Sequence, residues 1–123
     1  MIKFFDTSSL LLVADKLFQE ECQNEKIIIS SISLKELENI KNSNTKDPHI
    51  KYSARNLLRK LNDNPDKFIC EVYRQDMEHY IIENSLEVNN DTRILATAVY
   101  YLFNNIKIKD QFRFITNDLS LKM

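Results

Sequence analysis

Glycine is absent from this sequence of 123 residues, and cysteine, histidine and proline occur only twice each. A chain without glycine cannot form the phosphate-cradling loops that need close backbone approach, which argues against P-loop and dinucleotide-binding chemistry. Cys22 and Cys70 are too few for a disulfide framework, and together with His49 and His79 they show no zinc-site spacing. No apolar run approaches the ~20 residues of a membrane span, and the N-terminus lacks a signal peptide's apolar region. We therefore expect a cytoplasmic protein without a membrane partner.

The sequence does contain an uneven distribution of charge. The net charge is −1, but residues 41–60 contain six basic residues and one acid and so carry +5, which leaves −6 for the remainder. Three of these basic residues, Lys51, Arg55 and Arg59, recur along one face of an amphipathic helical pattern and are called the basic row below. The basic row is either a solvated helix face or a contact for the RNA backbone, and we slightly favour RNA.

Hydrophobic periodicity predicts one α/β domain over residues 1–123. Apolar or β-branched runs predict strands at 2–5, 26–30, 68–73 and 112–115. Helical spacing predicts helices over 10–18, from 33, over 50–61, over 77–84, and from 90 to about 102. The order strand, helix, strand, two helices, strand, two helices, strand implies a mainly parallel sheet covered on both faces.

Acidic residues stand where a parallel sheet gathers its ligands, beyond the carboxyl ends of its strands. Asp6 follows the first predicted strand, Asp118 follows the last, and Glu36 lies in the first turn of the helix after the second. Asp91 begins a helix without following a strand, so its place at the site depends on the fold. Each acid is also explained as a helix cap, and Ser33 to Glu36 has the spacing of a capping box. Four carboxylates in one crevice would repel one another unless a cation such as Mg²⁺ or Mn²⁺ compensates.

Four segments in order resemble the motifs of PIN domains: 2–8, 34–41, 91–98 and 114–118. The likeness covers nearly the whole chain and is closest to the PIN domains found ahead of PhoH-like ATPase modules. It implies a three-layer α/β/α fold with a central sheet of four to five strands. Ser30 and Ser31 stand where many relatives have proline. The chain stops soon after the fourth motif, where relatives usually continue, so we expect an incomplete sheet or an excised domain.

The resemblance implies endonucleolytic cleavage of single-stranded RNA, with Mg²⁺ or Mn²⁺ held by Asp6, Asp91 and Asp118 together with Glu36. Periodicity alone does not choose between Glu36 and Glu38, which fall on opposite flanks of one helix, and the resemblance chooses Glu36.

The sequence leaves two possible roles for three polar residues next to these acids. Thr7, Ser8 and Asn117 either orient a carboxylate from the second shell or serve as structural caps, and we favour the structural role. The resemblance suggests three possible protein partners: a second copy of the chain, an antitoxin or an ATPase.

Three other interpretations of the sequence were weighed against the nuclease. A catalytically weak PIN-like scaffold that binds RNA or protein is the main alternative, although four intact acids argue against it. Mg²⁺-dependent phosphatases with an aspartyl nucleophile normally need a second Asp two positions on, where this chain has Ser8. Receiver domains are disfavoured because the third strand, 68–73, ends without an Asp.

Overall fold

The computed structural model describes residues 1–14 and 26–116 of the chain. The strands are β1 (Ile2–Phe5), β2 (Lys26–Ser30), β3 (Phe68–Glu71) and β4 (Phe112–Ile115). The helices are α1 (Thr7–Leu12), α2 (Ser31–Lys41), α3 (Pro48–Asp63), α4 (Asp76–Glu83), α5 (Asn90–Asn104) and the short 3-10 helix η2 (Ile106–Gln111). The order of strands and α-helices is the predicted one. The third strand ends at Glu71 rather than Tyr73, and η2 was not anticipated.

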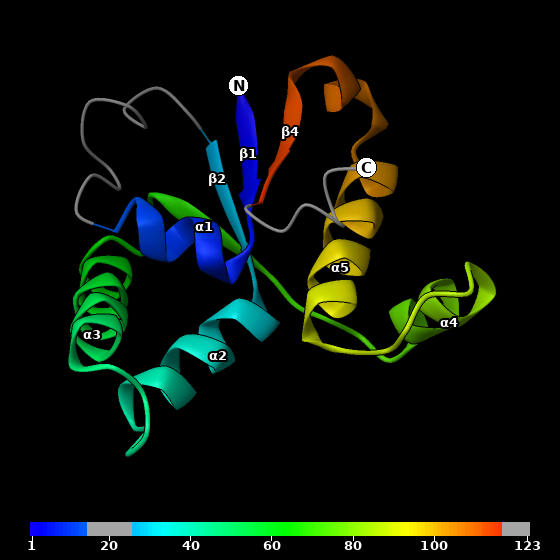
Figure 1. The fold of residues 1–123 in the computed structure, drawn as a ribbon. Helices are drawn as coiled ribbons and strands as arrows, with labels where there is room; N and C mark the ends of the chain where they lie inside the picture. The colour runs from blue at the N-terminus through cyan, green and yellow to red at the C-terminus, as the bar shows by residue number, and fades with distance from the viewer. Residues whose placement is uncertain (15–25, 117–123) are drawn as a thin grey trace.

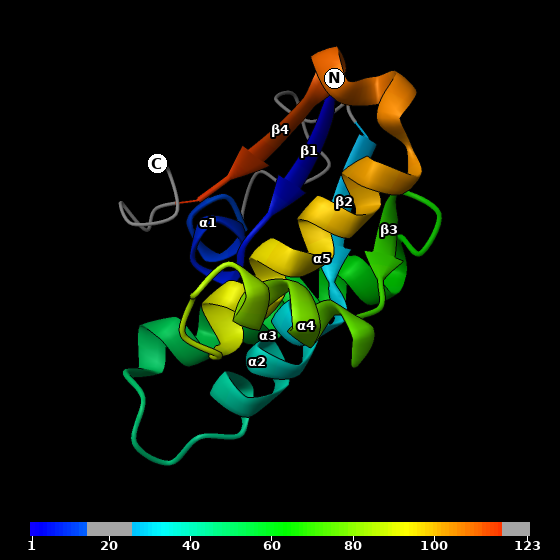
Figure 2. The same ribbon diagram turned by 90° about the vertical axis from the view of Figure 1, so that its right-hand side faces the viewer.

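The four strands form one sheet in the order β3-β2-β1-β4, and every neighbouring pair is parallel. This arrangement confirms the α/β prediction of a mainly parallel sheet with helical crossovers. In Figure 1 the strands run downward from the N-terminus, and α2 and the first turn of α5 lie below their carboxyl ends. The first and last described strands are side by side, with Phe5 opposite Ile115. Figure 2 shows the same sheet from the α5 side.

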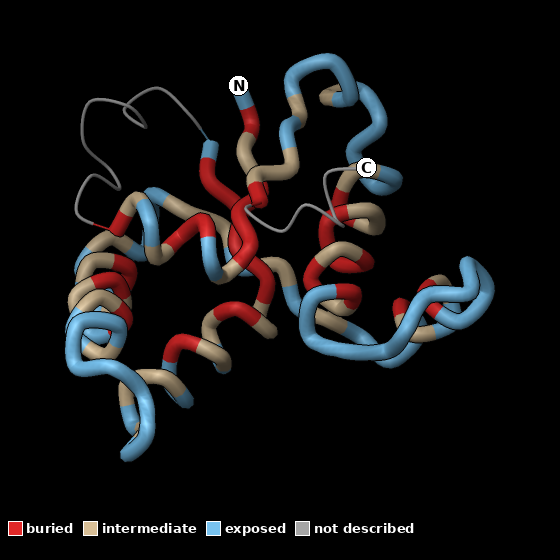
Figure 3. Tube along the Cα trace, viewed as in Figure 1, coloured by how far each residue is buried: buried red, intermediate tan, exposed pale blue. Residues whose placement is uncertain are grey.

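Two apolar layers enclose the sheet because successive residues of a strand point to opposite faces. Ile27 and Ile29 pack with α1, α2 and α3, whereas Ile28 packs on the other face with Phe4 and α5. Buried positions accordingly follow the strands and the sheet-facing sides of α3 and α5 (Figure 3). A smaller cluster around Met77 and Ile81 joins α4 to α5. The predicted three-layer architecture is therefore present.

Helix α2 begins earlier than the predicted capping box places it. Ser30 is the N-cap, and its hydroxyl accepts a hydrogen bond from the backbone N–H of Ile32 at 3.1 Å. The prediction that Ser33 caps this helix is wrong, because β2 passes directly into α2 and Ser33 is already inside it. Glu36 consequently lies in the second turn, where a capping role no longer explains it.

Two further expectations concern the first predicted helix and membrane-spanning segments. Leu17 and Phe18, assigned to the first predicted helix, lie outside the described residues. Within the described ranges, no helix is long and apolar enough to cross a membrane.

Candidate active site

Three of the four predicted acids line one cavity at the carboxyl end of the sheet. The cavity has a volume of about 430 Å³, and its walls come from α1, α2 and α5. The residues that line it are Asp6, Thr7, Ser8, Leu11, Glu36, Ile40 and Asp91. We call it the acidic cavity. Asp118 and Asn117, the other predicted members of the site, lie outside the described residues.

The Asp6 carboxylate is buried, with 5% of the residue exposed, and accepts three hydrogen bonds. Oδ1 accepts from the backbone N–H of Ser9 at 2.9 Å and from the Ser8 hydroxyl at 3.2 Å, and Oδ2 accepts from the Thr116 hydroxyl. The backbone N–H of Asp6 also donates to the Ile115 carbonyl at 3.1 Å. Asp6 is thus the N-cap of α1 and is tied to the end of β4.

Glu36 is positioned by a hydroxyl from another helix. Thr7 Oγ1 donates to Glu36 Oε1 at 2.7 Å and lies 3.1 Å from the hydroxyl oxygen of the buried Ser33. Since Asp6 caps α1, the favoured structural role for Thr7 and Ser8 as caps is wrong. Their hydroxyls instead contact Glu36 and Asp6, which is the carboxylate-orienting geometry.

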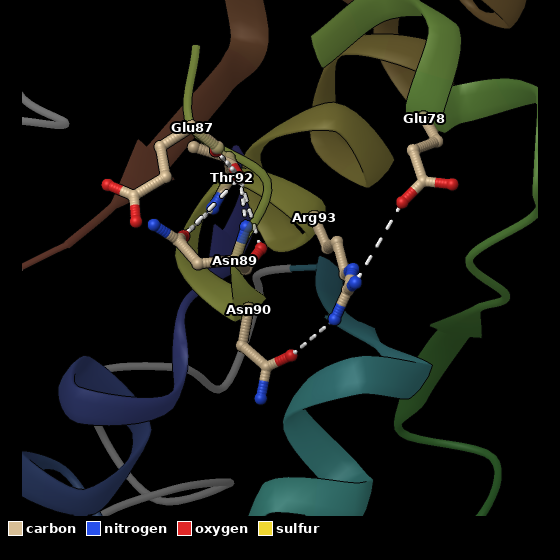
Figure 4. Close-up of polar contacts among 6 residues, drawn as sticks. All are labelled: Glu78, Glu87, Asn89, Asn90, Thr92 and Arg93. Carbon is tan, nitrogen blue, oxygen red and sulfur yellow. Dashed lines mark hydrogen bonds and ion pairs between the residues drawn. The ribbon is translucent and has the colours of Figure 1, made fainter. Parts of the chain in front are cut away.

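Asp91 is the second residue of α5, and a capping box fixes the start of that helix (Figure 4). Asn89 Oδ1 accepts from the Thr92 backbone N–H at 3.0 Å, and Thr92 Oγ1 accepts from the Asn89 backbone N–H at 3.0 Å. Arg93 donates to Asn90 Oδ1 at 3.1 Å and lies 3.8 Å from a carboxylate oxygen of Glu78 in α4. The sequence suggested that Asp91 was itself a cap, but Asn89 takes that role, and Asp91 lies in the first turn of α5, where it lines the acidic cavity.

The donor set of the acidic cavity fits a hard divalent cation, because all its charged groups are carboxylates. The described contacts occupy three of the ~four acceptor positions on Asp6, and fewer on Glu36, so both retain acceptor capacity. Within residues 1–14 and 26–116, no three acidic, histidine or cysteine side chains group closely enough to hold a metal ion. The metal site predicted from the sequence also includes Asp118, so it stays a prediction.

Two residues of the basic row lie beside α2, on the side of that helix opposite Glu36. Arg55 and Arg59 line a second cavity of about 640 Å³ together with Glu38 and Lys41. Lys41 forms an ion pair with Glu38 at 3.4 Å. The two glutamates that periodicity could not separate therefore face different cavities, with Glu36 in the acidic one.

Sequence reasoning did not assign three residues that support or line the acidic cavity. Thr116 directly follows the last predicted strand, and the pairing of that strand with β1 brings its hydroxyl to Asp6. Leu11 and Ile40 form apolar wall. Both lie within predicted helices, and nothing in the sequence distinguished a cavity wall from the core.

Comparisons with known proteins agree with this fold. The family model described as PIN domain matches residues 4–123. Among curated proteins, none matches the sequence significantly. One similar solved structure is VapBC2 from Rickettsia felis bound to a DNA fragment from their promoter. It has 19% sequence identity and a TM-score of 0.55, with coverage of 99% of this chain and 92% of the other. At that identity the likeness shows the fold, and closeness to PhoH-linked PIN domains is not shown.

Proposed function

Because this chain belongs to the PIN domain family, whose members are generally nucleases, we propose that it is a divalent-metal-dependent endoribonuclease that hydrolyses phosphodiester bonds of single-stranded RNA. The observation that carries the proposal is the meeting of Asp6, Glu36 and Asp91, from three separate elements, in one cavity beyond the strand ends. Parallel α/β sheets bind their ligands in this place.

The proposed division of roles follows from the contacts of each carboxylate. Asp6, Glu36 and Asp91, with Asp118, would hold Mg²⁺ or Mn²⁺. When bound, such an ion polarises a phosphate and lowers the pKa of a bound water, which supplies the nucleophile. Thr7 restrains the carboxylate of Glu36, so that its position is set before substrate arrives.

The three donors to Asp6 hold that carboxylate in the same way. Ser8, Ser9 and Thr116 donate from both ends of the described chain and fix both carboxylate oxygens. A carboxylate held by several donors points in one direction, which is what a ligand for a cation requires.

The basic row would bind the RNA backbone. Arg55 and Arg59 are exposed and face the cavity beyond α2, with Lys41, the last residue of α2, on the same side. These basic residues line a different cavity from the carboxylates, on the other flank of α2. The basic row would then hold phosphates distant from the cleaved bond, which contributes affinity with little base specificity.

A protein partner is the last part of the proposal. An antitoxin, an ATPase module or a second copy of the chain would regulate the nuclease. The likeness to VapBC2 supports the first of these.

A matched pair of substitutions in α2 tests the nuclease proposal. Glu36 and Glu38 are two residues apart, and they line different cavities. With labelled single-stranded RNA and Mn²⁺, Glu36→Gln should lower the cleavage rate at least about tenfold, as losses in metal-ligand shells do. At saturating RNA, Glu38→Gln should cleave like the parent, because Glu38 lies outside the acidic cavity and forms only an exposed ion pair with Lys41.

Asp6→Asn extends the test to the most constrained carboxylate. This substitution should abolish most of the cleavage while RNA still binds, since phosphate contacts do not need the metal ligands. Equal cleavage by the parent, Glu36→Gln and Asp6→Asn would assign the activity to a contaminant. A parent that binds RNA but does not cleave it with Mg²⁺ or Mn²⁺ would leave the scaffold alternative.

A further inference from the structure

A small hollow lies between α1 and α3, directly beside the acidic cavity. It has a volume of about 230 Å³ and is lined by Leu11, Leu12, His49, Ile50 and Ser53. We call it the α1/α3 hollow. Leu11 also lines the acidic cavity, so one side chain forms a wall of both spaces. The two spaces therefore adjoin at Leu11.

The walls of the hollow combine aliphatic surface with a ring and a hydroxyl. Leu12 is 70% exposed and Ile50 is 42% exposed, although both are large apolar residues. His49 supplies an exposed imidazole, and Ser53 supplies a hydroxyl one turn further along α3. Such walls suit a flat group with apolar faces and a polar edge. At about 230 Å³ the hollow is smaller than the ~300 Å³ typical of sites for larger molecules, so it suits a single ring system.

The position of His49 is fixed by the start of α3. Asp47 is the N-cap of this helix, and its Oδ1 accepts a hydrogen bond from the His49 backbone N–H at 2.7 Å. His49 and Ser53 are four residues apart and therefore lie on the same side of α3, facing α1. Arg55 and Arg59 face the other flank of the helix, toward α2.

We propose that the α1/α3 hollow binds one nucleobase of single-stranded RNA, next to the phosphate that enters the acidic cavity. This inference rests on the proposed nuclease function and specifies how its substrate lies. A polynucleotide carries a base beside every phosphate, so a strand that reaches the carboxylates must place a base near them. Unstacked bases bind by stacking on side-chain rings and through hydrogen bonds at their edges, which His49 and Ser53 provide.

Base binding and phosphate binding differ in their dependence on salt. A phosphate contact releases counterions, and each contact on single strands contributes roughly 0.7 to the slope of log affinity against log salt. Stacking of a neutral base releases none. His49→Ala should therefore weaken RNA binding without changing the salt slope, whereas loss of a basic-row contact changes both.

Binding is measured by fluorescence anisotropy with a labelled single-stranded RNA in EDTA, where metal-dependent cleavage cannot interfere. A series of RNAs carries one abasic site at each successive position. For the parent, one position should raise Kd by roughly 5- to 150-fold, the range expected for loss of one stacked base. In His49→Ala this penalty should disappear at that position, and the salt slope should equal that of the parent. His49→Phe, which keeps a ring, should retain the penalty.

His79→Ala is the matched control, because His79 is also exposed and lies in α4, away from the hollow. It should behave like the parent throughout. If abasic sites have no effect on the parent, or if His49→Ala keeps the full penalty, the hollow binds no base and the proposal is wrong. Absence of metal-dependent cleavage alongside a His49-dependent abasic penalty would overturn the nuclease function but support the base site.

Discussion

Replacing Thr7 by valine should disturb the acidic cavity while leaving every carboxylate in place. The Thr7 hydroxyl donates to Glu36 Oε1 at 2.7 Å, which joins α1 to the second turn of α2. Valine has nearly the same shape but no hydroxyl, so Glu36 loses this donor and can adopt other rotamers. Thr7→Ser keeps the donor and is the conservative control.

Two magnitudes follow from this contact. A hydrogen bond to a charged group is worth roughly 1.5–3 kcal/mol, and Thr7 is only half-buried, so we expect a loss of about 1 kcal/mol in unfolding free energy. For a chain of 123 residues that corresponds to a Tm lowered by about 3–5 °C. Removing a partner that orients a metal ligand typically costs 10- to 100-fold in metal affinity. A tenfold loss reduces the stabilisation by Mn²⁺ by up to about 1.4 kcal/mol, a limit approached when the metal saturates both proteins.

The assay is a thermal melt of parent, Thr7→Val and Thr7→Ser across a Mn²⁺ titration, combined with RNA cleavage rates. Thr7→Val should need at least about tenfold more Mn²⁺ for the same rise in Tm, and Thr7→Ser should resemble the parent. A double-mutant cycle with Glu36→Gln should show coupling between the two positions, because the variants remove one shared contact. If Thr7→Val melts lower but titrates with metal like the parent, Thr7 is structural and the positioning argument is refuted.

Divalent metal should raise the free energy of unfolding by about 2.7 kcal/mol at a concentration 100-fold above Kd. An unchanged Tm in millimolar Mn²⁺ would count against a metal site in the isolated chain. Alanine at all three positions of the basic row should weaken RNA binding and make the salt slope shallower by up to about 2 units, and an unaltered slope would make this row a solvated face. Partial desolvation, and secondarily the nearby Glu71 carboxylate, raises the pKa of the Cys70 thiol, although the residue is exposed. In a Cys22→Ser background, Cys70 should therefore react with a disulfide reagent at neutral pH more slowly than free cysteine does. Adding Glu71→Gln should raise this reaction rate, but not to the rate of free cysteine. A Cys70 that reacts as fast as free cysteine would contradict the raised pKa.

The order of strands and helices was predictable because the two periodicities are clear in this chain. The run Ile27 to Ile29 indicated a strand buried on both faces, and the structure packs its residues alternately into two apolar layers. The start of α2 was not predictable in the same way, because Ser30, Ser31 and Ser33 are all acceptable caps. The choice depends on where β2 stops pairing with β3, and that is a tertiary interaction.

Some residues of the site could be identified from the local sequence, whereas others depend on how the elements pack. Asp6 was identifiable from its place after a strand, whereas the choice of Glu36 over Glu38 needed either a family resemblance or the positions of α1 and α3. Asp91 reaches the acidic cavity only because α5 packs against the face of the sheet opposite α1. Thr116 donates to a residue 110 positions earlier, and no local pattern encodes that distance.

The bond between Thr116 and Asp6 has a consequence for the protein during its own synthesis. The backbone N–H of Asp6 pairs with Ile115, and its carboxylate pairs with Thr116, which is synthesised 110 residues after it. Ribosomes extend a chain at about 5–20 residues per second, and N-terminal segments emerge first. The Asp6 carboxylate therefore has its full set of donors only after residue 116 has left the ribosome. The arrangement of Asp6 in the acidic cavity is therefore complete only when β4 has docked beside β1.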